Sequence, residues 1–401
     1  IGSLSFSVAN ITCNLKSHLP AHLVELRAYA DKAYAAADVL AWRGDNDALQ
    51  WLHDKGVQIS WKAYAAAAAG GHLHTLEWLS EHCPLTFQPK NVMIAAARHG
   101  DLQILSWPEK HGFDCSQRAI DDACLNNHLE AAQWMYEVFD ARTSQVAFDH
   151  FASQGNLAGV EWIRNHNVGP GSMVAAVGAA ANGHLQMLKW LRNNPLVVTG
   201  SPDQHTHFSW AVLEAAVSNG QVETVSWLIE TQRSLVQPNA IRLAAGKGNV
   251  EILNMLLSKV DRIKGVDQAT SILSAAVRAN DVTAAKLVLA KIDDARTAVN
   301  ADLARQNPYN STSGDPSVLF TAAWAGNREM CALLLEYGAD PNRTAVVHYT
   351  TAETRTPLMM AAERGHMDVV ELLLQCGATV ISGVLRSAAR SKRPELLQLV
   401  L

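Results

Sequence analysis

A seven-residue string, Ala67-Ala68-Ala69-Gly70-Gly71-His72-Leu73, decides how this sequence is interpreted. It returns with few changes at residues 179–185 and again at residues 361–367. We call the residue in the place of Gly71 position zero. Related strings put position zero at twelve points: Gly44, Gly71, Gly100, Asn127, Gly155, Gly183, Gly220, Gly248, Asn280, Gly326, Gly365 and Lys392. Most of the steps between them are 27–29 residues long. A recurring period of this length is typical of stacked repeats.

Position zero is occupied by the residues that best tolerate a positive φ. Nine of the twelve are glycine and two are asparagine, and only Lys392 departs from this rule. A helix commonly ends on such a residue. Position +1 is Asp or Asn in six copies, and these are favoured N-cap residues. Each copy is therefore predicted to be a helix, a tight left-handed turn and a second helix.

The residues around the turn predict that the helices pack on one another. Positions −4 and −3 are small, mostly alanine, which lets two helices approach closely. Positions +2, +5 and +8 are apolar, a helical spacing that Leu73, Leu76 and Leu79 exemplify. Helices of about ten residues do not persist alone, so neighbouring copies must bury their apolar faces. We expect an all-α solenoid of about twelve stacked copies.

The later copies resemble ankyrin repeats. Thr356-Pro357-Leu358 followed by Gly365-His366 is similar to the start of such a repeat, and residues 333–342, Leu-Leu-Leu-Glu-Tyr-Gly-Ala-Asp-Pro-Asn, are similar to its second helix and finger. The resemblance covers roughly residues 34–401. Earlier copies are shorter than the family's 33 residues and are similar to the short arrays of protists and large DNA viruses. We therefore expect short or trimmed hairpin fingers. The resemblance implies a non-catalytic module that binds a protein along a concave face.

Several segments depart from the repeat. Residues 1–33 fit no copy and are interpreted as an N-terminal cap or the tail of an upstream segment. Because residue 1 is Ile, we expect the numbering to begin inside a longer chain. Longer steps place insertions near residues 195–210, 291–316 and 340–355. Pro108 stands at +8 of its copy, where a proline removes a helix hydrogen bond, so we expect that helix to end early or kink.

All eleven tryptophans fall in three phases of the repeat. Seven lie at +7, beside the core position of the second helix: Trp51, Trp78, Trp107, Trp134, Trp162, Trp190 and Trp227. We expect this set to be structural packing. The other four lie off this ladder, Trp42 and Trp324 at −2, and Trp61 and Trp210 at −10.

Composition excludes several classes of function. The 401 residues carry 33 basic and 38 acidic side chains, which argues against nucleic acid as a partner. No apolar run is long enough to predict a membrane partner or a spanning helix. Six widely spaced cysteines fit a reducing, intracellular compartment, cytoplasmic or nuclear, better than a disulfide scaffold.

Residues that could carry chemistry do not form a recognisable constellation. His205 and His207 make a His-x-His pair without a third ligand at zinc spacing, and Cys83 and Cys115 lie at different phases. Phosphate-loop, nucleophile-elbow and zinc-protease motifs are absent from the sequence. We expect no catalytic residue, metal or cofactor.

The ankyrin resemblance also implies which residues would contact a partner, because engineered ankyrin binders place target contacts at −10, −2 and −1. Carried over to this chain, those phases give Trp61, Trp210 and Arg355 at −10; Trp42, Arg98, Arg278, Trp324, Glu363 and Arg390 at −2; and Arg43, His99, Lys247 and Arg364 at −1. The expected function is a scaffold or adaptor that is monomeric alone. The alternatives are a permanent structural subunit of a large complex and a substrate receptor of a ubiquitin ligase with its docking domain upstream.

Overall fold

The computed structural model describes residues 36–84, 90–166, 172–194, 208–232, 235–301, 317–348, 353–391 and 393–401. The predicted cap at 1–33, the pair His205 and His207, and most of the insertions at 195–210 and 291–316 lie outside these residues. Nothing in the described part tests the domain boundaries proposed above.

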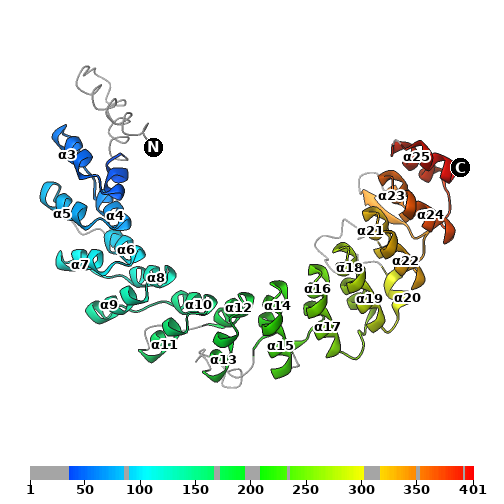
Figure 1. Cartoon of the computed structure of the whole chain (residues 1–401), viewed down its shortest axis with the longest axis horizontal. Coiled ribbons are helices and arrows are strands. Elements are labelled where there is room, and N and C mark those ends of the chain that lie inside the picture. The colour runs from blue at the N-terminus through cyan, green and yellow to red at the C-terminus, as the bar shows by residue number, and fades with distance from the viewer. Residues whose placement is uncertain are drawn as a thin grey trace, which may run out of the picture. The chain divides into compact units, whose positions relative to one another are not determined.

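Each copy contributes a first helix before position zero and a second helix after it (Figure 1). The first helices are residues 36–43, α4 Trp61–Gly70, α6 Lys90–His99, α8 Gln117–Leu125, α10 Gln145–Ser153, α12 Met173–Ala181, α14 Trp210–Ser218, α16 Pro238–Lys247, α18 Val266–Arg278, α21 Val318–Ala325, α23 Pro357–Arg364 and α25 Ser382–Arg390. The second helices are α3 Asn46–Asp54, α5 Leu73–His82, α7 Leu102–Lys110, α9 Leu129–Phe139, α11 Leu157–Asn165, α13 Leu185–Asn193, α15 Val222–Thr231, α17 Val250–Ser258, α19 Val282–Lys291, α22 Arg328–Glu336, α24 Met367–Gln375 and α26 Pro394–Val400. The predicted all-α repeat fold is confirmed.

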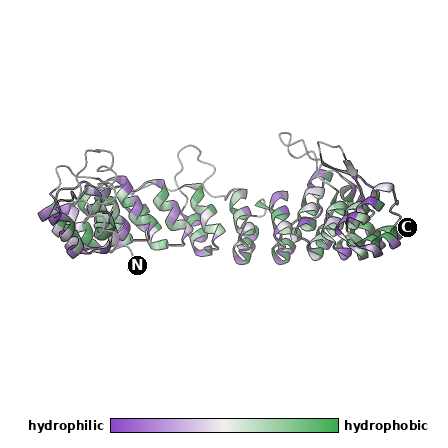
Figure 2. Ribbon diagram, turned by 90° about the horizontal axis from the view of Figure 1, so that it is seen from above, coloured by the Kyte–Doolittle hydropathy of each residue, from purple (hydrophilic) through white to green (hydrophobic). Residues whose placement is uncertain are grey.

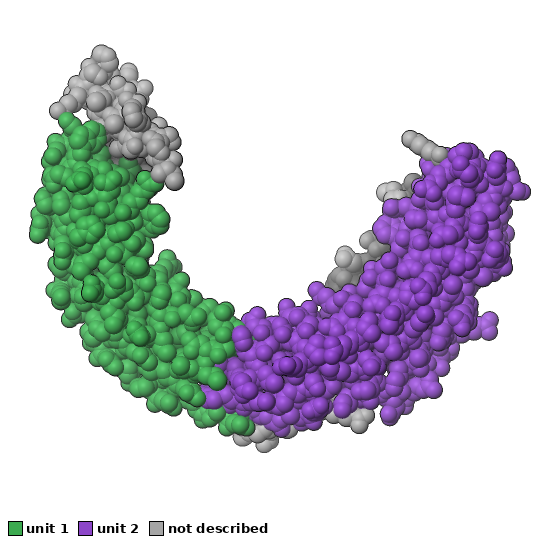
Figure 3. All heavy atoms as spheres, viewed as in Figure 1, with its two compact units in different colours: residues 1–178, 193–205 green, residues 179–192, 206–401 purple. Residues whose placement is uncertain are grey.

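The chain divides into two compact units (Figure 3). Unit 1 comprises Ile1–Gly178 and Asn193–His205, and unit 2 comprises Ala179–Arg192 and Thr206–Leu401. Within each unit, neighbouring first helices contact one another and form one row. Neighbouring second helices form a second row beside it. Figure 2 shows apolar and polar residues alternating along the individual helices, as expected of amphipathic helices that bury one face. No helix in the described ranges is both long and apolar enough to span a membrane.

Small residues at −4 and −3 pack the first helices closely. Ala67, Ala68, Ala244 and Ala245 are fully buried, as are the equivalent alanines of most other copies. Leu76 and Leu79 of α5 are also fully buried. The core of each unit therefore lies between its two rows of helices, as the spacing of the apolar residues predicts.

The left-handed turn is present at every copy whose position zero is described. All nine glycines and both asparagines have a positive φ, from 58° at Asn280 to 81° at Gly365. Lys392 lies outside the described residues. An L side chain with a Cβ is disfavoured by about 1–2 kcal/mol in this conformation, which explains why the sequence keeps Gly or Asn there.

At several copies the turn also leaves little room for a side chain, because the next copy lies against it. A Cβ added to Gly44 would lie 2.7 Å from the ring of His72, which is position +1 of the next copy. His128 covers Gly100 and His366 covers Gly326 in the same way. The Nε2 of His128 then donates a hydrogen bond to the carbonyl of Arg98, 3.0 Å away. The +1 side chain thus joins consecutive copies at the turn.

In the last copies, asparagine side chains join consecutive loops at the helix ends far from the position-zero turns. The amide of Asn300 donates to the carbonyl of Gly338 and accepts from the N–H of Asp340, both at 2.8 Å. Asn342 repeats this pattern with Gly377 (3.0 Å) and Thr379 (2.7 Å). Because each amide uses both a donor and an acceptor, it fixes the spacing of two neighbouring loops.

The +7 tryptophans pack within the array. Trp107 and Trp162 are buried, and the other five are half-buried. The indole N–H of Trp78 donates to the Gln50 side chain of the preceding copy at 3.0 Å. In three copies a histidine at +11 donates through Nδ1 to the Trp carbonyl: His82, His111 and His166. The rings of Trp78 and His82 stack with centroids 4.6 Å apart.

One local expectation, an early end of the helix at Pro108, was wrong. α7 runs through Pro108 to Lys110, and the proline ring is buried among the core residues, which offsets the lost hydrogen bond. The start of the third long step forms an additional helix, α20 Ala295–Asn300, capped by Asp294. The insertion at 340–355 forms a short hairpin of β1 Ala345–His348 and β2 Glu353–Arg355, one of the two forms expected for the fingers. Phe320, Ala345 and Met360 form a buried cluster at its base.

Replacing a turn glycine tests whether the packing of the next copy matters beyond φ. Gly56 and Gly100 both have a positive φ, but a Cβ on Gly56 meets nothing within 4 Å whereas one on Gly100 overlaps His128. We expect Gly56→Ala to cost about 1 kcal/mol of unfolding free energy. Gly100→Ala should cost a further ~1–3 kcal/mol through overpacking. Urea unfolding measures both, and equal losses would contradict the close contact.

The tryptophan ladder gives a second stability prediction. Trp78→Ala and Trp190→Ala remove a large side chain packed between copies, so each should cost ~3–5 kcal/mol of stability. Thermal and urea unfolding of the purified variants measure the change. A loss below about 1 kcal/mol for both would show that the ladder is not structural packing.

Candidate functional site

Large apolar side chains that remain exposed to solvent gather on the first helices. In the described part of unit 1 these are Val39, Trp42, Leu125, Val146, Met173 and Val174, and in unit 2 they are Trp210 and Trp324. Trp42 is 56% exposed, Trp210 58% and Trp324 45%. The described second helices expose only two residues of this kind, Leu102 and Val138. Exposed apolar groups that gather on one set of helices are candidates for an interaction surface.

Charge is also divided between the two rows of helices. The first helices of unit 2, α14 to α25, carry six basic side chains, Arg242, Lys247, Arg278, Arg364, Arg386 and Arg390, against three acidic ones, Glu214, Asp267 and Glu363. The second helices of the same unit, α15 to α26, carry three basic side chains, Lys286, Lys291 and Arg328, against eight acidic ones: Glu223, Glu230, Glu251, Glu329, Glu336, Asp368, Glu371 and Glu395. A chain with a net charge of −5 thus has a basic first-helix row in unit 2.

The basic side chains of unit 2 form a stripe beside the turns. We call Lys247, Arg278, Trp324, Arg364 and Arg390 the C-terminal basic stripe. All five stand at −2 or −1 of consecutive copies and are exposed. Their helices, α16, α18, α21, α23 and α25, contact one another in this order.

Trp324 and Arg364 form the centre of the stripe. The guanidinium of Arg364 lies over the Trp324 ring, 4.3 Å from its centroid, which is a cation–π contact. Two described acidic residues lie beside the stripe: Asp281, whose carboxylate lies at the turn next to Lys247, and Glu363. Glu363 is half-buried, pairs with Arg355 and lies 3.9 Å from the Arg390 guanidinium. It is therefore engaged by two arginines.

The predicted contact residues of unit 1 are less uniform. Trp42 and Arg43 are exposed, while Trp61 is half-buried at the start of α4. Arg98 is exposed but pairs with Asp122 of the next first helix at 2.9 Å. His99 is half-buried because its ring lies against the turn at Gly71.

Of the thirteen predicted contact residues, nine are exposed on first helices: Trp42, Arg43, Arg98, Trp210, Lys247, Arg278, Trp324, Arg364 and Arg390. Trp61, His99 and Glu363 are half-buried. Arg355 is 9% exposed because the β1–β2 hairpin holds it against Glu363, so we leave it out of the surface. The sequence analysis missed Val146 and Val174, which stand at −9. An apolar residue directly after the first position of a first helix was the signal available.

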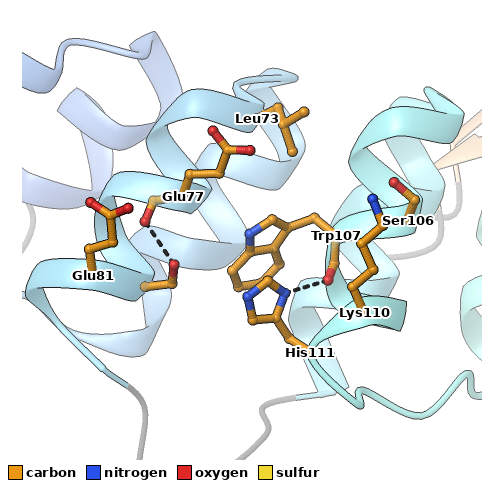
Figure 4. Close-up of a pocket in the computed structure, with 8 residues that line it drawn as sticks. Leu73, Glu77, Glu81, Ser106, Trp107, Lys110 and His111 are labelled. Atoms are coloured by element: carbon orange, nitrogen blue, oxygen red, sulfur yellow. Dashed lines mark hydrogen bonds between the residues drawn. The ribbon is translucent and has the colours of Figure 1, made fainter.

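A hollow of about 320 Å³ lies between α5 and α7 on the second-helix face of unit 1 (Figure 4). Glu77 and Glu81 line it from α5, and Lys110, His111 and the buried Trp107 line it from α7. The Trp107 and His111 rings stack with centroids 4.0 Å apart. The indole N–H of Trp107 has no hydrogen-bond partner among the described residues, although Glu77 occupies the position equivalent to Gln50, which serves Trp78.

The thiols in the described part are free cysteines, and three of them are poorly suited to metal binding or nucleophilic attack. Burial raises the pKa of Cys115 to about 11 and that of Cys124 and Cys331 to about 12. These groups stay protonated at neutral pH, whereas both ligation and attack require the thiolate. Within the described ranges, His, Cys, Asp and Glu form no group of three that could hold a metal ion.

Comparison with known proteins identifies the repeat. A family model described as "Ankyrin repeats (3 copies)" matches residues 172–267, 241–345 and 273–382, together more than half of the chain. A curated protein of fission yeast (Schizosaccharomyces pombe), "Glycerophosphocholine phosphodiesterase gde1", is 25% identical over 162 residues. That match covers 39% of this chain and 13% of the yeast protein. The chain therefore matches about an eighth of its relative's length.

The exposed tryptophans should affect binding and leave stability unchanged. We expect Trp42→Ala and Trp324→Ala to weaken partner binding by ~2 kcal/mol or more, because exposed Trp residues are frequent interface hot spots. Their melting temperatures should stay close to that of the unsubstituted chain, since both side chains are about half exposed. Binding titrations and calorimetry measure the two effects, and a large drop in melting temperature with unchanged binding would reject these contacts.

Proposed function

This chain belongs to the ankyrin repeat proteins, and from that premise we propose that it binds a protein partner along the first-helix faces of its units. Ankyrin repeats are non-catalytic and generally mediate protein–protein interaction. The proposal concerns which face of this array is used and with what chemistry. The yeast relative's phosphodiesterase name describes that protein, and the matched segment is too small a part of it to carry an activity to this chain.

The sorting of side chains between the two rows is the observation that supports this proposal. Most of the exposed large apolar residues on helices lie on first helices. In unit 2 the first helices also carry an excess of basic side chains, while the acidic side chains concentrate on the second helices. Packing does not require this division, because both rows have a buried face and a solvent face. Interfaces favour Trp and Arg over Glu and Asp, which matches the first-helix face.

Position-specific photo-crosslinking tests which face contacts the partner. A photoreactive phenylalanine analogue would replace Val174 or Trp324 on the first helices, and Leu102 or Val138 on the second helices. All four side chains are exposed in the folded chain, so a probe at each position is accessible to a partner. We expect one and the same protein to be captured, in the cells that make this chain, from both first-helix positions and from neither second-helix position.

One further variant makes the result decisive. Trp42→Ala in the cross-linking chain should lower the yield at Val174 if unit 1 contacts the partner through its first helices. Equal capture from Leu102 and Val174 would reject the first-helix face as the binding surface.

A further inference from the structure

We propose that the C-terminal basic stripe binds an extended, acidic segment of a protein partner, running across the last five copies. This inference rests on the proposed function, because it names the chemistry of the partner at one part of the first-helix face. It follows from the charges of the stripe, from its central aromatic contact and from its linear arrangement.

Of the four cations of the stripe, only Arg390 has an acidic partner among the described residues, Glu363 at 3.9 Å. Among the described residues, Lys247, Arg278 and Arg364 form no ion pair, and all three are exposed. Glu363 is engaged by Arg355 and Arg390 and cannot neutralise the others. Like charges at neighbouring positions repel, so an incoming anionic group gains attraction and also relieves this repulsion.

The Trp324–Arg364 contact gives the stripe an anchor with two kinds of chemistry. A guanidinium stacked on an indole face keeps its N–H donors at the edge free for a carboxylate, which it can hold with two parallel hydrogen bonds. The exposed part of the Trp324 ring offers an apolar surface next to those donors. An acidic segment containing an aliphatic or aromatic side chain would satisfy both groups at once.

The geometry of the stripe favours an extended chain. One side chain is contributed by each consecutive first helix, and neighbouring packed helices lie about 8–10 Å apart. Four such steps span roughly 32–40 Å. An extended segment rises about 3.3 Å per residue, so about twelve residues cover this length.

A nucleic acid fits this surface less well than a peptide. A polyphosphate is strongly and continuously charged, and the whole chain has a net charge of −5 with an acidic second-helix row in the same unit. A short acidic segment needs only the local positive potential of the stripe. It can also pack an apolar side chain against the exposed ring of Trp324.

The test uses the full chain and a fluorescent peptide of about twelve residues, rich in glutamate with a central leucine. Fluorescence anisotropy at low and at physiological ionic strength gives the dissociation constants.

We expect binding that weakens with salt, and at least tenfold weaker binding when glutamine replaces glutamate in the peptide. The double variant Arg278→Gln, Arg364→Gln should weaken binding at least tenfold and reduce the salt dependence. Trp324→Ala should weaken binding while leaving the salt dependence unchanged.

A matched control separates the stripe from general electrostatics. The double variant Lys286→Gln, Arg328→Gln removes the same charge from second helices of unit 2, and Lys286 already lies 3.4 Å from Glu329. We expect it to change peptide affinity less than about threefold. An equal loss in both double variants, or equal affinity for the glutamine peptide, would overturn the proposal.

Two other occupants are tested in the same assay. A single-stranded oligonucleotide that binds more tightly than the peptide would make nucleic acid the occupant and overturn the proposal. Analytical ultracentrifugation that shows a dimer lost in Arg278→Gln, Arg364→Gln would instead assign the stripe to a second copy of this chain. If cross-linking still captures the partner from first helices while the acidic peptide does not bind, this inference fails and the proposed function stands.

Discussion

The structure depends on one recurring contact, in which a side chain of one copy, at +1 for most of the described turns and at −1 for His99, lies against the left-handed turn of the copy before it. Gly100 has a positive φ, and the ring of His128 lies directly over it. Only a residue without a Cβ can adopt this φ and still leave space for the ring. The hydrogen bond from His128 to the Arg98 carbonyl adds a directional link. Because the contact recurs from copy to copy, it sets the register of the stack within each unit.

A fixed register has a consequence for the surface. Residues at one phase of the repeat, such as −2 and −1, fall on neighbouring helices and form a continuous line, as Lys247, Arg278 and Trp324 do. Side chains of one chemical type that recur at one position of the repeat therefore form a continuous stripe on the surface. The fixed register also gives the second-helix row its own chemistry. The +7 tryptophans and +11 histidines pack along this row, and acidic side chains are exposed on it.

This arrangement separates the two tasks of the chain. The tryptophans of the ladder contribute to cohesion between copies, which is why Trp107 and Trp162 are buried. The tryptophans off the ladder are exposed or half-buried on first helices and have little part in the core. A repeat array has no single pocket to define its function, so the distribution of charge and apolar area over its faces is the most direct guide to its partner.

The sequence by itself determined the repeat, the turns and the two-row arrangement, because glycine at position zero and the apolar spacing around it are local rules of backbone and burial. It also placed most candidate contact residues on the solvent side of the first helices.

Tertiary structure decided the rest. Arg355 is buried because a hairpin formed by the insertion folds it onto Glu363, and α7 continues through Pro108 because burial of the ring in the core offsets the missing hydrogen bond. Val146 and Val174 are exposed only because no neighbouring helix in the described part covers position −9, and the pairing of Arg98 with Asp122 requires two helices from different copies. Such outcomes depend on contacts between residues distant in sequence, which no local pattern specifies.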